Sequence, residues 1–299
     1  MINLKKFLQL NLLLFLVAIL PQSVFAQSSD SVTWKNEGTL GFNFSNVGLS
    51  NWAPGGESSV SIGTIINYSK TRTTSKGTWV NQFDFALGGT KLGKQEFRKN
   101  DDAVTLLSQY NLTINDKWAW SIAGIMRTQL LEGINYDSDV LDKISDFMAP
   151  GYLKINLGVE FKAGDIFNST IAPAAGKFTF VLDDYLSSLG AFGINPGDQV
   201  RTEFGANILS TLKIPIAENI TFESNLNFFT GYATFGNVDT FWNTLIVMKV
   251  NSWFNATFGT ELFYDDDIKI EQEDGTFQRK IQFKHVLNVG VNFSLAKAS

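Results

Sequence analysis

The chain has 299 residues, 24 Lys and Arg against 29 Asp and Glu, a formal net charge of −5 and no cysteine. These numbers exclude disulfides, thiol chemistry and a lipidated N-terminal cysteine, and the acidic balance argues against a nucleic-acid partner. The 26 Phe, 7 Trp, 7 Tyr and 25 Gly, beside only 6 Pro, indicate many aromatic strands joined by tight turns.

The first 26 residues have the pattern of a Sec-type signal peptide. Lys5 and Lys6 precede an apolar run over 7–20, and the small-residue ending Val24-Phe25-Ala26 predicts cleavage after Ala26. The alternative, a membrane-anchoring helix, needs about 20 apolar residues, and this run is shorter. We therefore expect an exported protein in which residues 27–299 form a single β-domain.

Beyond Ala26 the apolar residues alternate with a period of two, which predicts strands rather than helices. Over 58–70, for example, Val60, Ile62 and Ile66 share one face, and only Ile65 breaks the alternation. The pattern predicts about twelve strands in an all-β fold. They cover 40–44, 58–70, 83–88, 104–114, 118–126, 153–161, 166–182 with a break near Pro173, 204–212, 220–232, 241–250, 254–264 and 281–295.

Strand length and loop length favour an antiparallel up-and-down barrel that spans a membrane over a soluble β-sandwich. Strands of about 10 to 14 residues match a tilted bilayer crossing. Short connections at 115–117, 163–165, 214–219 and 251–253 lie between long ones at 91–100, 132–151, 183–200, 233–240 and 265–280. Such an alternation is typical of outer-membrane barrels, with short periplasmic turns and long outer loops. An even strand number also places both termini on the periplasmic side.

Aromatic residues near strand ends support the same interpretation, because Trp and Tyr favour the headgroup zone of a membrane. The predicted interface aromatics are Trp52, Trp79, Trp118, Trp120, Tyr232, Trp253 and Tyr264.

If the apolar face meets lipid, the opposite parity faces the lumen, and most mid-strand charges fall there. The predicted lumen charges are Asp84, Arg127, Lys154, Glu160, Arg201, Glu203, Lys213, Glu223, Lys249, Glu261 and Lys284. A barrel of about twelve strands can be a polar conduit or can be plugged by neutralising ion pairs. The mixed signs favour a plugged or narrow lumen.

Two features invite a chemical interpretation. Asp265, Asp266 and Asp267 open an acidic loop, but its spacing lacks the alternating ligands and glycine of an EF-hand, so a solvated loop is favoured over a metal site. The single histidine, His285, lies on the apolar parity, and Leu287 stands where a lipase-like strand would carry serine. No catalytic residue and no cofactor are therefore predicted.

Several segments resemble an uncharacterised family of Bacteroidota outer-membrane proteins, a domain of unknown function. These segments are NWAPGG at 51–56, FMAPGYL at 147–153, GAFGINPG at 190–197, YDDDIKI at 264–270 and QFKHVLNVGV at 282–291. The resemblance implies an outer-membrane β-barrel and supplies no substrate or catalytic residue.

Three functions stay open at this point. The first is a non-enzymatic barrel of a Gram-negative cell envelope, either a porin-like narrow channel or a structural and docking component. The second is an outer-membrane hydrolase acting on lipid or peptide, and the third is a soluble periplasmic β-protein. The expected partners are outer-membrane lipid and, during biogenesis, the barrel assembly machinery; the sequence indicates no particular protein partner.

Overall fold

The computed structural model describes residues 32–47, 58–135, 142–251, 253–268, 270–271 and 276–296. The predicted signal peptide, Trp52 with the NWAPGG segment, and the last three residues lie outside these ranges. None of the helices within the described ranges is long and apolar enough to cross a membrane.

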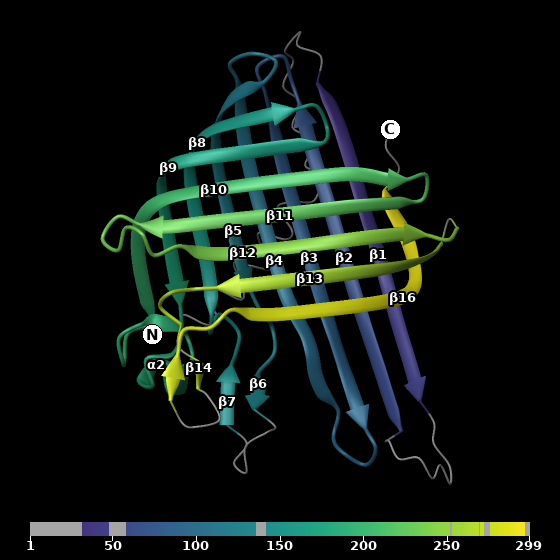
Figure 1. Cartoon of the computed structure of the whole chain (residues 1–299), viewed down its shortest axis with the longest axis vertical. Helices are drawn as coiled ribbons and strands as arrows, with labels where there is room; N and C mark the ends of the chain where they lie inside the picture. The colour runs from purple at the N-terminus through teal and green to yellow at the C-terminus, as the bar shows by residue number, and fades with distance from the viewer. Residues whose placement is uncertain are drawn as a thin grey trace.

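Twelve long antiparallel strands close into one barrel (Figure 1). They are β1 (Thr33–Val47), β2 (Ser59–Thr73), β3 (Gly77–Leu92), β4 (Arg98–Thr113), β5 (Trp118–Thr128), β8 (Gly151–Ala163), β9 (Phe167–Phe180), β10 (Val200–Ala217), β11 (Ile220–Gly231), β12 (Asp239–Lys249), β13 (Phe254–Tyr264) and β16 (Gln282–Ala296). Each pairs with the next in chain order, and β1 pairs with β16 to complete the ring. The predicted twelve-stranded up-and-down barrel is confirmed.

The connections differ at the two ends of the barrel, as the alternation of lengths predicts. One end, the turn end, carries the tight connections at 114–117, 164–166 and 218–219, while the longer connections gather at the other, the loop end (Figure 1). The prediction of a long loop over 91–100 is wrong. Strand β3 extends to Leu92 and β4 begins at Arg98, so their connection is the short segment 93–97.

Short elements that the alternation does not reveal fold inside the long loops. Residues 129–150 hold the hairpin of β6 (Gly133–Asn135) and β7 (Asp142–Ser145). Residues 181–199 hold α2 (Asp184–Ser188) and the 3-10 turn η1 (Ala191–Gly193). The 265–281 segment holds the small pair β14 (Ile270–Glu271) and β15 (Phe277–Gln278).

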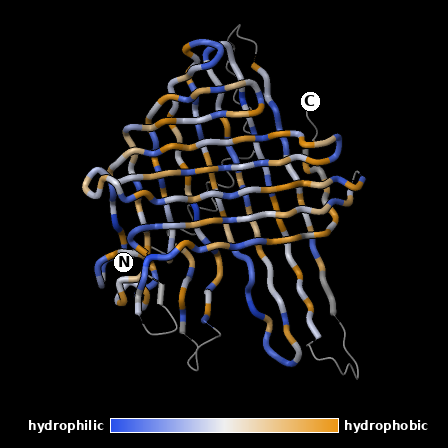
Figure 2. Tube along the Cα trace, in the orientation of Figure 1, coloured by the Kyte–Doolittle hydropathy of each residue, from blue (hydrophilic) through white to orange (hydrophobic). Residues whose placement is uncertain are grey.

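Side chains on one parity of each strand point outward and are apolar, and many stay exposed in the isolated chain. Phe44, Phe204 and Leu287 expose 67%, 68% and 66% of their surface. Figure 2 shows the orange apolar positions alternating with blue and white polar ones along the strands. A soluble protein buries side chains of this size, so the outer face matches a lipid environment.

A β-bulge in β9 lies at the predicted break near Pro173. The register shifts there on both sides, between Leu157 and Val159 in β8 and between Gly205 and Asn207 in β10. Pro173 has no N–H to give to a ladder, so it is tolerated in a strand interior only at such an irregularity. Before the bulge Ala172 points inward, and after the bulge Ala175 and Lys177 point inward. All three side chains are buried.

Candidate functional site

The barrel interior is the candidate functional site, because the inward parity carries most of the strand charges. All eleven predicted lumen charges lie at the parity opposite the exposed apolar side chains. Their contacts fall into an ionic group near the loop end, a layer of asparagines in the middle and a polar network near the turn end.

Lys177 of β9 is the centre of the ionic group. Its Nζ lies 2.5 Å from Asp239 Oδ2, 2.7 Å from Asp265 Oδ2 and 3.5 Å from Glu203 Oε2. The side chain is almost fully buried, and its ammonium lies 5.7 Å from the centre of the Phe229 ring. Arg201 extends the group through ion pairs with Glu203 and Asp267.

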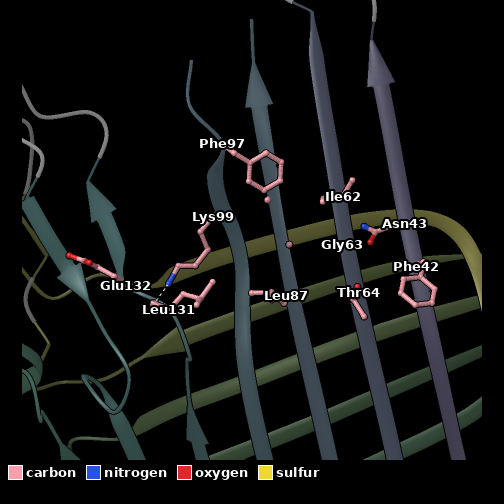
Figure 3. Close-up of a pocket in the computed structure, with 12 residues that line it drawn as sticks. Phe42, Asn43, Ile62, Gly63, Thr64, Leu87, Phe97, Lys99, Leu131 and Glu132 are labelled. Atoms are coloured by element: carbon pink, nitrogen blue, oxygen red, sulfur yellow. Dashed lines mark hydrogen bonds between the residues drawn. The ribbon is translucent and has the colours of Figure 1, made fainter. Parts of the chain in front are cut away.

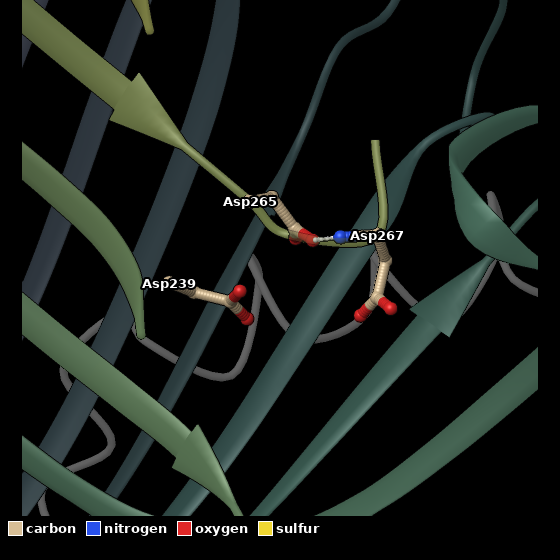
Figure 4. Close-up of side chains that lie close together, drawn as sticks. All are labelled: Asp239, Asp265 and Asp267. Carbon is tan, nitrogen blue, oxygen red and sulfur yellow. Dashed lines mark hydrogen bonds between the residues drawn. The ribbon is translucent and has the colours of Figure 1, made fainter. Parts of the chain in front are cut away.

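The same group contains three carboxylates whose oxygens lie within 4.8 Å of one another, those of Asp239, Asp265 and Asp267 (Figure 4). Both oxygens of Asp265 already accept hydrogen bonds, from Lys177 and from the backbone N–H of Asp267 at 3.0 Å. Asp239 likewise accepts from Lys177 and from the N–H of Asp266. The arrangement is therefore an ion-pair network around a lysine, and it offers no argument for a metal.

Of the three predicted weak metal candidates, the structure brings only Asp265 and Asp267 together. The Asp266 side chain accepts hydrogen bonds from Asn237 at 2.6 Å and from the Tyr264 hydroxyl at 3.2 Å. It also lies 3.4 Å from Arg279. Asp266 thus connects the loop after β11 with the loop after β13.

Two ion pairs cross the interior between strands that are not neighbours. Arg127 of β5 donates to Glu261 of β13 at 2.9 Å, and these strands occupy opposite positions in the ring. Lys284 of β16 donates to Asp101 of β4 at 2.8 Å. Because the barrel is closed, contacts between such distant strands pass through its lumen.

Further in, uncharged side chains fill the lumen between β8 and β11. Asn207 donates to Asn156 at 2.8 Å and Asn227 donates to Asn207 at 2.9 Å. Lys154 donates to Asn227 at 2.5 Å. Asn156 and Asn207 are each only 1% exposed, so solvent is excluded from this part of the interior.

Near the turn end, the side-chain amide of Gln109 bridges several strands. Its Nε2 lies 3.0 Å from the Ser121 hydroxyl, 3.3 Å from the Thr170 hydroxyl and 3.5 Å from a carboxylate oxygen of Glu160. Glu160 is buried, and its other oxygen lies 3.3 Å from Lys162.

The remaining predicted charges have looser surroundings. Asp84 accepts a hydrogen bond from Asn67 at 2.8 Å. Lys213 pairs with Glu223 at 2.6 Å but is 61% exposed, and Lys249 is exposed at the turn end of β12.

The predicted interface aromatics that fall in the described ranges lie at strand ends. Trp118 and Trp120 are exposed at the turn end, where the Trp118 and Phe161 rings pack 5.0 Å apart. Trp79 and Trp253 are exposed at the same end, and Tyr232 and Tyr264 lie at the loop end.

His285 points outward beside Phe283, with ring centres 6.1 Å apart. Its cross-strand neighbour is Thr260, whose hydroxyl group is hydrogen-bonded to the hydroxyl group of Thr244. Within the part of the chain that the structure describes, no carboxylate forms a hydrogen bond or ion pair with His285.

Several charged residues of the interior were not among the predicted lumen charges: Lys177, Asp239 and Asp267 of the ionic group, and Asp101, the partner of Lys284. The Lys177 parity is hidden by the bulge at Pro173, which interrupts the count along the strand. Asp239 and Asp101 lie near strand ends, where the alternation gives no signal.

A closed ring of twelve antiparallel strands, apolar outside and hydrogen-bonded inside, is the architecture of a transmembrane β-barrel protein. The soluble alternative would bury the outward apolar side chains, and this barrel exposes them. Residues 44–134 match the model of a family described as "Protein of unknown function (DUF3078)". The predicted resemblance to an uncharacterised family is confirmed, while a Bacteroidota origin stays a prediction.

Solved structures of outer-membrane proteins are similar to this chain. An outer membrane channel from Pseudomonas putida F1 is 9% identical with a TM-score of 0.39, over 92% of this chain and 99% of that one. The translocator domain of the autotransporter NalP from Neisseria meningitidis is 10% identical with a TM-score of 0.32, over 96% and 95%. OmpT, an outer membrane protein of Vibrio cholerae, is 8% identical with a TM-score of 0.31, over 91% and 100%. No curated protein sequence matches the chain significantly.

Proposed function

We propose that this protein is a non-enzymatic barrel of the outer membrane, exported by the signal peptide at residues 1–26, and that it forms a narrow polar channel. The passage runs along the inner wall formed by β1, β2 and β3. Arg127–Glu261 and Lys284–Asp101 restrict it near the loop end.

The observation that carries the proposal is the asymmetry of the inner face. On β5, β8 and β10 the inward residues Ala123, Asn156 and Asn207 are at most 1% exposed. On β1, β2 and β3 the inward residues Thr39, Asn67 and Gln82 are exposed to solvent. Small residues continue this wall at Gly63 and Gly88, which take less room than any side chain. One side of the lumen is therefore filled, while water reaches the other.

The charge of the two restricting pairs supports a small and weakly selective passage. Each pair joins one cation to one carboxylate, so the narrow region has little net charge. The side chains of Arg127 and Lys284 remain 33% and 39% exposed, which is consistent with a water-filled space beside them. The non-enzymatic part of the proposal is supported by His285, which points outward beside Phe283 and has no hydrogen bond or ion pair with a described carboxylate.

Conductance of single proteins in planar bilayers tests the channel. We expect a small conductance for the native chain, and a several-fold larger one for the double variant Arg127→Ala with Lys284→Ala, because both pairs that restrict the lumen are removed. Asn67→Trp places an indole on the open wall and is expected to reduce the current. Ile66→Trp, one position along the same strand but pointing to lipid, is the matched control.

A second candidate, a structural or docking barrel without passage, is favoured by the packed layer between β8 and β11. The same measurement separates the two. Folded native protein and folded double variant that both fail to conduct would contradict the channel and favour the docking role.

A further inference from the structure

A groove near the loop end is formed mainly by outward-facing side chains, and it also reaches the backbone of Gly63 and Gly88. It has a volume of about 640 Å³, within the usual range for small-molecule sites, and it spans β1 to β4 and the segment that follows β5. Figure 3 shows Phe42, Ile62 and Leu87 on three neighbouring strands, Phe97 in the segment that precedes β4, and Leu131 at one side. Phe42, Ile62 and Leu87 are on the outward parity, so this floor faces the membrane.

The aromatic wall of the groove depends on a glycine. An ideal Cβ at Gly89 would lie 2.0 Å from the Phe97 ring, so the ring packs directly on the backbone of β3. Phe97 is nevertheless 50% exposed, which leaves the other side of the ring open to the groove. One face of the Phe97 ring therefore packs on the backbone of β3, and the other face is not covered by protein atoms.

A hydrogen-bonded rim borders one side of the groove, where Lys99 and Leu131 lie (Figure 3). Asp102 accepts from the backbone N–H groups of Leu130 and Leu131 at 2.9 and 2.8 Å. Lys99 donates to Asp102 at 3.0 Å and to the Leu131 carbonyl at 2.7 Å. These hydrogen bonds fix Leu131 beside the floor, so this side of the groove has a defined shape.

The hairpin above the groove is basic. Between positions 91 and 99 the chain carries Lys91, Lys94, Arg98 and Lys99 against the single acid Glu96. Lys91 and Lys94 are exposed, and neither forms an ion pair with another described residue. An apolar floor at membrane depth beneath exposed lysines matches a molecule with an acyl chain below and a negative headgroup above.

We propose that this groove binds an acylated lipid of the outer leaflet whose phosphate lies against Lys91 and Lys94. One acyl chain covers Phe42, Ile62 and Leu87 and contacts the open side of the Phe97 ring. The phosphate interacts with the two lysines that have no carboxylate partner among the described residues. The site lies on the lipid side of the wall and does not depend on passage through the lumen.

Native mass spectrometry of the delipidated full chain tests the site, with dimyristoyl phosphatidylglycerol and the matched phosphatidylcholine as probes. We expect one phosphatidylglycerol to be retained in preference to phosphatidylcholine. Lys91→Gln and Lys94→Gln should each reduce the preference for phosphatidylglycerol about fivefold, because each cation near the surface contributes about that factor to the affinity.

Leu87→Trp fills the groove and is expected to abolish retention of both lipids. Leu157→Trp makes the same change on the outward face of β8, away from the groove, and is expected to bind like the native chain. Heat-modifiable migration on gels checks that both variants fold. Equal retention of the two lipids, or no retention by the native chain, would overturn the proposal, as would undiminished retention by folded Leu87→Trp.

Discussion

At the scale of single residues, Lys177 shows how a charge is kept inside the barrel. Burying an ammonium is costly unless it is paired and hydrogen-bonded. Lys177 meets that need with Asp239 and Asp265 as direct partners, and Glu203 stands slightly further away. Since these residues come from β9, β10, β12 and the loop after β13, one side chain joins strands across the filled side of the lumen.

Replacing this lysine should therefore be costly. Lys177→Met leaves two buried aspartates without their cation, and breaking a buried pair in this way typically costs about 3 to 5 kcal/mol. Lys213→Met removes an exposed lysine from its pair with Glu223 and should cost about 0 to 1 kcal/mol. Urea unfolding of the barrel in detergent measures both, and equal losses would contradict a central role for Lys177.

The residue scale also marks where sequence reasoning succeeds and where it stops. Alternation is sufficient to assign a parity to residues such as Arg127 and Glu261. Nothing in the alternation indicates that these two side chains meet, because they are 134 positions apart and their contact arises only when the barrel closes. Lys177 was missed for a local reason, since the bulge at Pro173 shifts the parity before it.

At the scale of elements, glycine is required where neighbouring strands approach closely: at Gly158, which faces the irregular stretch of β9, and at Gly205, which faces β11. An ideal Cβ at Gly158 of β8 would lie 2.0 Å from the Ile171 carbonyl oxygen and 2.6 Å from Ala172 Cα. An ideal Cβ at Gly205 of β10 would lie 1.9 Å from the Thr230 carbonyl oxygen. These contacts are with backbone atoms, which cannot move aside without disrupting the ladder.

Gly158→Val is accordingly expected to prevent most of the chain from reaching the folded state. Gly124→Val in the adjacent β5 is the matched control, because no atom lies within 4 Å of the ideal Cβ at Gly124. The fraction of protein that migrates as the heat-modifiable folded band measures the effect. Similar folded fractions for the two variants would show that the close approach at Gly158 is not required.

The twelve strands could be predicted because a membrane barrel repeats one simple pattern along its whole length. The loop elements could not, since their stability comes from contacts between distant segments. Lys143 of β7 illustrates this: it lies 2.9 Å from Asp183 at the N-cap of α2 and 3.1 Å from Asp146. The hydrogen bond that Lys143 donates to the Asp183 carboxylate raises the pKa of Lys143 above its ordinary value. The pairing of these two loops is thus invisible in either segment alone.

At the scale of the whole molecule, the two ends of the barrel predict its orientation. Long loops face outward and short turns face the periplasm in outer-membrane barrels. Because the chain has no cysteine, single cysteines can report on each end. Ala233→Cys, in the connection between β11 and β12, should react with an impermeant maleimide on intact cells. Asp165→Cys, in the turn between β8 and β9, should react only after lysis. The reverse labelling would invert the orientation.

The pairing that closes the ring differs from all the others. Among the described residues, six positions of β1 pair with β16, from Gly38 to Asn43, whereas fifteen pair with β2. The other neighbours follow one another in chain order, so they can form as successive hairpins at a modest entropic cost. The β1–β16 pair joins opposite ends of the chain, and its loop-closure entropy is the largest in the molecule. We therefore expect the ring to form by successive hairpins and to close last at this short seam, which is also where we expect it to open first.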